Sequence, residues 1–167
     1  ELVYPLSQHI GAPATPIVAV GDTVLKGQKI AEAGGFVSAP IHASVSGTVK
    51  KIEPRRVPTG DMVNSIVIES DGEFKEVEYQ AVEDVSALSK EEIINRIKEA
   101  GVVGMGGAGF PTHVKLSPKE PEKIDYIIAN CAECEPYLTS DYRIMLDHTE
   151  ELVEGMRIIL SMFEHAK

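Results

Sequence analysis

Short apolar runs separated by turn residues fill the first 75 residues of the chain. The runs are rich in β-branched side chains and cover residues 16–20, 24–25, 45–52 and 63–68. Glycine-containing pairs such as Gly21-Asp22 and Gly34-Gly35 lie between them, and such pairs are typical of tight turns. Because several short strands at this spacing can close on themselves, we predict a small all-β barrel or sandwich.

The apolar pattern changes to helical spacing after residue 88. Ser89 and Glu92 have the spacing of a capping box, in which two side chains satisfy each other's backbone N–H groups. Ile93, Ile97 and Ala100 then recur at helical intervals. Gly101 stands where a left-handed C-terminal cap belongs. These features predict a helix over residues 89–100.

Three further elements are predicted downstream. Residues 124–129 form a short apolar run, which we interpret as a buried strand of an α/β sheet. Ser140 or Asp141 can cap a short helix that extends to Leu146. The last predicted helix has an apolar face, which we expect to pack against a core rather than lie on a membrane. The residues of this face are Leu152, Val153, Met156, Ile159, Leu160 and Phe163.

The chain is expected to contain two domains with a mixed, α+β organisation. A charged, weakly patterned linker covers residues 71–88, and we place the boundary near residue 80. Residues 1–80 then form the β domain, and residues 81–167 form the first part of an α/β domain. The chain has no initial Met and ends inside a helical pattern, so we interpret it as a piece of a longer protein.

Composition narrows the range of partners. The formal net charge is −10, which disfavours nucleic acid and anionic membrane surfaces because both select basic patches. No apolar run reaches the ~20 residues that span a bilayer, so we expect no direct membrane insertion. Two cysteines close together do not form a secreted disulfide framework, which favours a reduced, cytoplasmic compartment.

The segment with the strongest chemical signal contains five glycines, at positions 101, 104, 106, 107 and 109. We call residues 101–109 the glycine loop. Dense glycines let backbone N–H groups approach an anion, and Lys115 follows as a cation for a phosphate. The loop follows a helix and lacks a Gly-Lys-Ser/Thr ending, so it is neither a dinucleotide fingerprint nor a P-loop. The alternative is a surface turn that needs positive φ angles.

A second loop, residues 130–141, follows the predicted strand, where ligands of α/β sheets bind. Asn130, Glu133 and Glu135 can hydrogen-bond a heteroaromatic ring or sugar hydroxyls, and the alternative is a polar turn with internal hydrogen bonds. Cys131 and Cys134 are compatible with half of a zinc or iron–sulfur site or with a redox pair. Neighbouring carboxylates raise a thiol pKa, so both cysteine interpretations are weaker.

The first domain resembles the lipoyl/biotinyl-carrier domain, a barrel-sandwich hybrid. The similar segments are residues 20–30 and 38–49. Carrier domains have a modifiable lysine on the hairpin between these segments, whereas residues 31–47 contain no lysine. The resemblance therefore implies the fold without the covalent carrier function. His42 lies in this region, and we interpret it as structural rather than as a ligand.

Two motifs resemble those of the NADH- and FMN-binding subunit of respiratory complex I. They are Gly-x-Gly-Gly-Ala-Gly-Phe-Pro-Thr-x-x-Lys at 104–115 and Asn-x-x-Glu-x-Glu-Pro at 130–136. The segment Asn-x-Ala-Glu-Cys-Glu-Pro-Tyr at 130–137 and the carrier-like domain are more similar to the C subunit of Rnf-type ion-translocating electron-transport complexes. The second domain is therefore expected to be the start of a flavin- and NADH-binding α/β domain.

This resemblance implies a set of site residues, with no catalytic side chain and no metal ligand among them. FMN would be held by Gly104, Gly106, Gly107, Gly109, Lys115, Asn130 and Glu133, and NAD(H) would face Phe110 and Glu135. Ala132 stands where the complex I loop has an aspartate, so one flavin contact is missing. The ferredoxin-like region of the family is also missing, so 4Fe-4S clusters are expected only in the absent C-terminal part.

The implied function is that of a peripheral subunit on the cytoplasmic face of the cell membrane. It would pass electrons between NAD(H) and iron–sulfur clusters in a ferredoxin:NAD oxidoreductase, with the other subunits of the membrane-bound complex as partners. The main alternative is a structural or docking module of such a complex without flavin. A thiol oxidoreductase using Cys131 and Cys134 is a weaker third possibility. The 167-residue piece alone is expected to be inactive.

Overall fold

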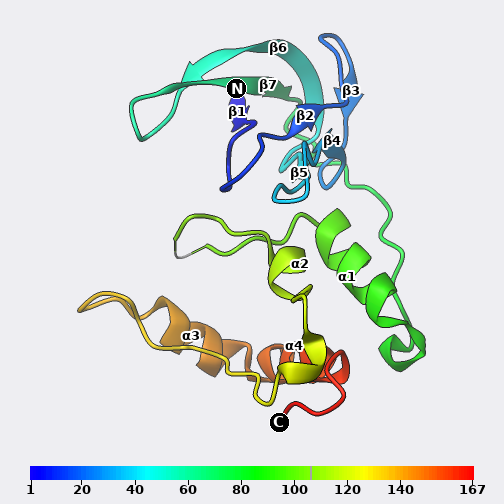
Figure 1. The fold of residues 1–167 in the computed structure, drawn as a ribbon. Coiled ribbons are helices and arrows are strands. Elements are labelled where there is room, and N and C mark those ends of the chain that lie inside the picture. Colours follow the sequence, from blue (N-terminus) through cyan, green and yellow to red (C-terminus); the bar gives the residue numbers. More distant parts are fainter. Residues whose placement is uncertain (106) are drawn as a thin grey trace. The chain divides into compact units, whose positions relative to one another are not determined.

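The N-terminal residues form the β structure that the apolar pattern predicts. The computed structural model describes residues 1–105 and 107–167, and Figure 1 shows its elements. The strands of the described residues are β1 (Leu2–Pro5), β2 (Thr15–Pro16), β3 (Thr23–Val24), β4 (Lys29–Glu32), β5 (Ile41–His42), β6 (Gly47–Arg56) and β7 (Met62–Ser70). All of their pairings are antiparallel.

Two sheets enclose the apolar core of this β structure. One has the strand order β1-β7-β6-β3, and the other has the order β2-β4-β5. In Figure 1, β6 and β7 form a long curved hairpin, and its register shifts between Val49 and Lys51. The side chains of Val24, Ile30, Val49, Ile66 and Ile68 are fully buried. Burying each such side chain stabilises the fold by about 1.5–3 kcal/mol.

The helices follow the strands in sequence. They are α1 (Lys90–Glu99), α2 (Thr112–Lys115), α3 (Ser140–Asp147) and α4 (Thr149–Ser161), with short 3-10 turns η1 (Val85–Ala87) and η2 (Pro121–Lys123). No helix among the described residues has the length and apolarity that crossing a membrane requires.

Helix α1 confirms the predicted caps at both of its ends. The Glu92 carboxylate accepts a hydrogen bond from the Ser89 N–H at 2.8 Å, and the Glu92 N–H donates to the Ser89 hydroxyl at 3.3 Å. At the other end, Gly101 has φ +70°. Its N–H donates to Lys98 C=O, and the Val102 N–H donates to Ile97 C=O. This pair of bonds is a Schellman motif, which turns the chain sharply into the glycine loop.

The chain divides into two compact units, and the division falls inside α1. Unit 1 contains Glu1–Ala81 and Ile94–Lys115, and unit 2 contains Val82–Ile93 and Leu116–Lys167. The described residues of the glycine loop therefore belong to the same unit as the β structure.

The strand predicted at residues 124–129 is wrong. These residues carry no strand, and Tyr126 and Ile128 are 68% and 83% exposed. Their backbone finds only a short pairing, in which Lys167 N–H donates to Asp125 C=O and Ile127 N–H donates to Lys167 C=O. A strand needs a neighbour along its length, and the sheets of the described residues all lie between residues 2 and 70.

The predicted start of the short helix also needs correction. The residue at the N-cap of α3 is Thr139, and its side chain makes no capping hydrogen bond. The Glu133 carboxylate caps the helix instead, because its Oε1 accepts from the Tyr142 N–H at 2.9 Å. A carboxylate at this position also interacts favourably with the helix dipole.

The last helix packs within unit 2 mainly through its C-terminal end. Met162 and Phe163 are buried, whereas Val153, on the predicted apolar face, is 44% exposed. The Lys90 ammonium lies 4.4 Å from the centroid of the Phe163 ring. This cation–π contact ties the start of α1 to the end of α4.

A candidate anion site at the glycine loop

The glycine loop is closed at its base by backbone hydrogen bonds. Val103 and Pro111 form an antiparallel bridge, the Gly104 N–H donates to Phe110 C=O at 2.9 Å, and the Thr112 N–H donates to Val102 C=O at 3.0 Å. Helix α2 begins directly after this closure. The short helix therefore carries its last residue, Lys115, back toward the base of the loop.

Lys115 places a positive charge beside the loop. Its Nζ lies 3.1 Å from the point that a Cβ on Gly104 would occupy, so a side chain at position 104 would crowd the ammonium group. Lys115 is exposed, and none of the ion pairs formed by the described residues involves it. In a chain with a net charge of −10, this ammonium provides a local site for an anion.

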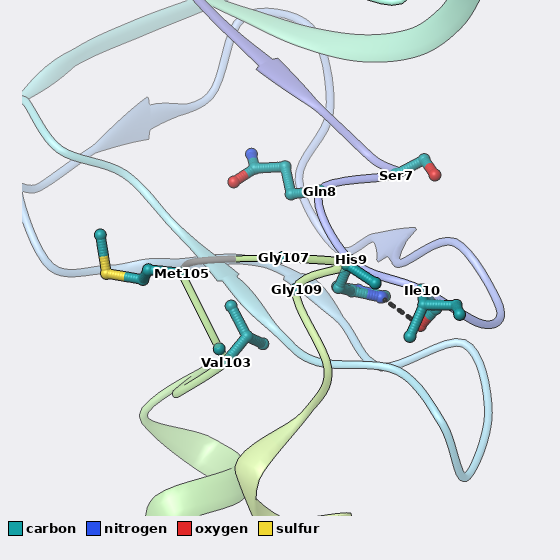
Figure 2. A pocket seen from close by; sticks show the side chains of 10 residues that line it. Ser7, Gln8, His9, Ile10, Val103, Met105, Gly107 and Gly109 are labelled. Atoms are coloured by element: carbon teal, nitrogen blue, oxygen red, sulfur yellow. Dashed lines mark hydrogen bonds between the residues drawn. The ribbon is translucent and has the colours of Figure 1, made fainter. Parts of the chain in front are cut away.

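An open depression of about 670 Å³ lies next to the loop. Residues 7–10 of the barrel line one part of it, and residues 103–105 and 107–109 line the other (Figure 2). The Ile10 N–H donates to Ala108 C=O at 2.9 Å, which fastens the loop to the barrel segment. The volume is within the range of about 300–1,000 Å³ that is typical of small-molecule sites.

Gly109 is the position where the loop approaches the barrel most closely. Its φ is +64°, and a Cβ there would lie 2.9 Å from Gln8 O and 3.0 Å from His9 Cα. A Cβ on Gly107 would instead meet nothing within 4 Å. The loop therefore places the Gly109 backbone against the barrel and leaves the Gly107 backbone open to approach by an anionic group.

Strand β4 and the connection from β4 to β5 support the helices on either side of the loop. The Lys29 ammonium and the Glu99 carboxylate are 2.5 Å apart, and the ring of buried His113 lies within hydrogen-bonding distance of Phe36 C=O, with 3.2 Å between Nε2 and the oxygen. These contacts join β4 to the end of α1 and the hairpin connection to α2.

His42 packs under the turn that leads into the glycine loop. A Cβ on Gly101 would lie 3.3 Å from His42 Nδ1. Burial and the nearby Lys29 ammonium lower the pKa of His42, and the Glu99 backbone and carboxylate oppose this shift. The lowered pKa favours a neutral ring at pH 7. The described residues contain no group of three or more His, Cys, Asp and Glu that could hold a metal ion.

The residues predicted in the second loop belong to unit 2, and each of the three has a local hydrogen bond through its side chain or its backbone. Asn130 Oδ1 accepts from the Ala132 N–H at 3.1 Å, and Glu133 caps α3. The Glu135 C=O accepts from the Leu138 N–H at 3.3 Å, which closes a turn. Cys131 and Cys134 are free thiols.

The structure brings together part of the predicted site. Gly104, Gly107, Gly109 and Lys115 lie in unit 1 around one loop, and Phe110 contributes the carbonyl that closes it. Gly106 lies outside the described residues. Residues 7–10 were missed, because nothing in their local sequence indicates that they face a loop about a hundred positions away.

Comparisons with known proteins identify both parts of the chain. Residues 1–73 match the RnfC barrel sandwich hybrid domain, and residues 97–167 match the Nuo51 FMN-binding domain. The chain thus joins a domain of the barrel sandwich hybrid kind to a segment similar to an FMN-binding domain. This finding confirms the predicted fold class.

Similar proteins extend this comparison to nearly the whole chain. The chain is 47% identical, over 95% of its length, to the C subunit of the Na(+)-translocating ferredoxin:NAD(+) oxidoreductase complex of Acetobacterium woodii. It is 48% identical, over its whole length, to the C subunit of the proton-translocating complex of Clostridium ljungdahlii, and 44% identical, over 98%, to the C subunit of the ion-translocating oxidoreductase complex of Salmonella gallinarum. The chain is thus similar, along nearly its whole length, to C subunits of Rnf-type ion-translocating electron-transport complexes. It spans 36%, 37% and 24% of the lengths of these three relatives.

Proposed function

We propose that the glycine loop and Lys115 bind the phosphate of FMN in an electron-transfer subunit of a ferredoxin:NAD oxidoreductase. The observation that supports this most directly is the Lys115 ammonium beside Gly104, a glycine that lines the open depression. Gly104, Gly106, Gly107 and Gly109 would supply the close backbone approach. The match of residues 97–167 to an FMN-binding domain is in agreement with this assignment.

The remaining predicted residues complete the proposal. Asn130 and Glu133 would hydrogen-bond the ribityl chain and ring edge of FMN, and Phe110 and Glu135 would face NAD(H). Bound flavin would supply hydride exchange with NAD(H) and single-electron exchange with iron–sulfur clusters elsewhere in the protein. The residues of this chain bind and orient, and none of them is assigned a proton-transfer role.

The proposed setting is the cytoplasmic face of the membrane, where the subunit would associate peripherally with the other subunits of the complex. The names of the relatives describe ion-translocating complexes with several subunits. Recruitment through protein partners is in keeping with the net charge of −10, which disfavours direct attraction to anionic lipid.

A docking module without flavin is the second candidate. The observation that favours it is that Asn130 and Glu133 already have backbone partners, in Ala132 and Tyr142. Binding a ligand through these side chains would require exchanging those bonds. A thiol oxidoreductase has less support, because acidic residues 133 and 135 surround the two free thiols.

Flavin content of the full-length protein tests the two main candidates. We expect the protein to retain FMN after purification or reconstitution, and its visible absorbance to bleach when NADH is added without oxygen. A reconstituted, folded protein that binds no FMN would support the docking module instead. The double variant Cys131→Ser/Cys134→Ser should bleach like the parent, because neither thiol is assigned a contact with FMN or NAD(H).

A further inference from the structure

We propose that the barrel domain forms one wall of the FMN site and that Gln8 contacts the bound cofactor directly. This inference deepens the proposed function and rests on it. The depression beside the glycine loop takes part of its lining from Ser7, Gln8, His9 and Ile10. These residues lie between β1 and β2, far in sequence from the flavin motif.

The barrel segment and the loop are held together by backbone contacts. The Ile10 N–H donates to Ala108 C=O at 2.9 Å, and the Gly109 backbone lies so close to Gln8 O and His9 Cα that no Cβ fits. The two backbones therefore meet directly at this point. A ligand held by the glycine loop lies next to the barrel segment.

His9 fixes the conformation of this segment. Its ring is 8% exposed, and the Ala39 N–H donates to its Nε2 at 3.1 Å. Because Nε2 accepts this bond, the neutral ring carries its proton on Nδ1, which donates to Ile10 C=O at 3.1 Å (Figure 2). His9 thereby links the carrier-like hairpin to the backbone that presents Gln8.

Gln8 has the chemistry of a ligand-binding residue on this wall. It is exposed, and its carboxamide has no hydrogen-bond partner among the described residues. In Figure 2 the Gln8 side chain extends from the barrel segment toward the Met105 end of the glycine loop. A carboxamide both donates and accepts, so it suits phosphate oxygens and ribityl hydroxyls. The described residues that line the depression include no acidic side chain.

The test compares Gln8→Glu with Gln80→Glu in the full-length apo-protein. Both changes add one negative charge to an exposed glutamine of unit 1, but Gln80 is not among the described residues that line the depression. FMN binding is measured by quenching of flavin fluorescence. We expect Gln8→Glu to weaken FMN binding at least about tenfold, because it places a carboxylate against an anionic ligand. Gln80→Glu should remain within about twofold of the parent.

Gln8→Ala serves as a second variant that adds no charge. Loss of one neutral hydrogen bond should weaken FMN binding by about threefold to tenfold, and far-ultraviolet circular dichroism should match the parent. If both Gln8 variants bind FMN like a parent that itself binds FMN, the barrel wall is refuted and the proposed function stands. If the folded parent binds no FMN, the proposed function fails and this inference fails with it.

Discussion

Lys115 is an exposed cation whose position is set by the protein. The backbone closure of the glycine loop and the single turn of α2 hold its ammonium near Gly104. Its charge is then available for the ligand, because no ion pair of the described residues uses it.

The first prediction follows from that arrangement. Lys115→Ala in the full-length protein should weaken FMN binding about tenfold to a hundredfold, since a charge-assisted hydrogen bond contributes about 1.5–3 kcal/mol. Lys115→Arg should weaken it less, because the charge is kept while the geometry changes. Fluorescence titration of the apo-protein measures both. Lys119→Ala, which removes an exposed lysine that belongs to unit 2, is the control. Parent-like affinity in Lys115→Ala would show that Lys115 is not the phosphate partner.

The second prediction separates two glycines of the same loop. Gly109→Ala forces a Cβ against Gln8 and His9 at a positive φ, so we expect the free energy of unfolding to fall by about 1–3 kcal/mol. In Gly107→Ala the added Cβ lies in open space, so the free energy of unfolding should change by less than about 0.5 kcal/mol. Urea denaturation of the two variants measures the difference. Equal stabilities would mean that Gly109 does not need its left-handed conformation.

The sequence predicted those residues of the candidate site that can be recognised from their immediate neighbours in the chain. Clustered glycines and a following lysine can be recognised within a few positions, and Gly109 indeed adopts a positive φ. Gln8 and His9 could not be predicted, because their role depends on contacts with Gly109 across about a hundred residues. Glu133 lies between these two cases in how well its role could be predicted. The residue was recognised as part of the second loop, but its capping role depends on Tyr142, which is in the next helix.

Elements differ in how well their own sequence determines them. Helix α1 was predicted closely because its capping box and terminal glycine are both within the helix segment. The strand expected at residues 124–129 did not form, because apolar composition alone does not supply a pairing partner. Strands β4 and β5 are short, and their apolar signal is correspondingly weak.

The third prediction concerns the carrier-like hairpin. Residues 31–47 contain no lysine, and the hairpin connection instead contacts α2 through Phe36 and His113. We therefore expect no lipoyl or biotinyl group on this domain when the protein is isolated from its native host. Intact-mass measurement tests this, with a peptide map of residues 29–50 as a check on position. An added mass of either group on this peptide would contradict the prediction.

At the scale of the whole molecule, the two units differ in how much of their own apolar surface they bury. Unit 1 has a continuous core of fully buried aliphatic residues between its two sheets. In unit 2, Tyr126, Ile128 and Tyr137 are 68%, 83% and 102% exposed. The chain spans about a third of the length of relatives such as those from Acetobacterium and Clostridium.

The last prediction follows from this incomplete burial. The 167-residue chain by itself should oxidise NADH with an artificial acceptor at a negligible rate, because Asn130 and Glu133, which are expected to hold the ribityl chain and ring edge, are occupied by backbone N–H groups. The full-length protein, assayed at equal concentration with added FMN, is the comparison and should be active. Steady-state absorbance of NADH measures both. Rapid turnover by the 167-residue chain would show that these two units already form a complete flavin and nucleotide site.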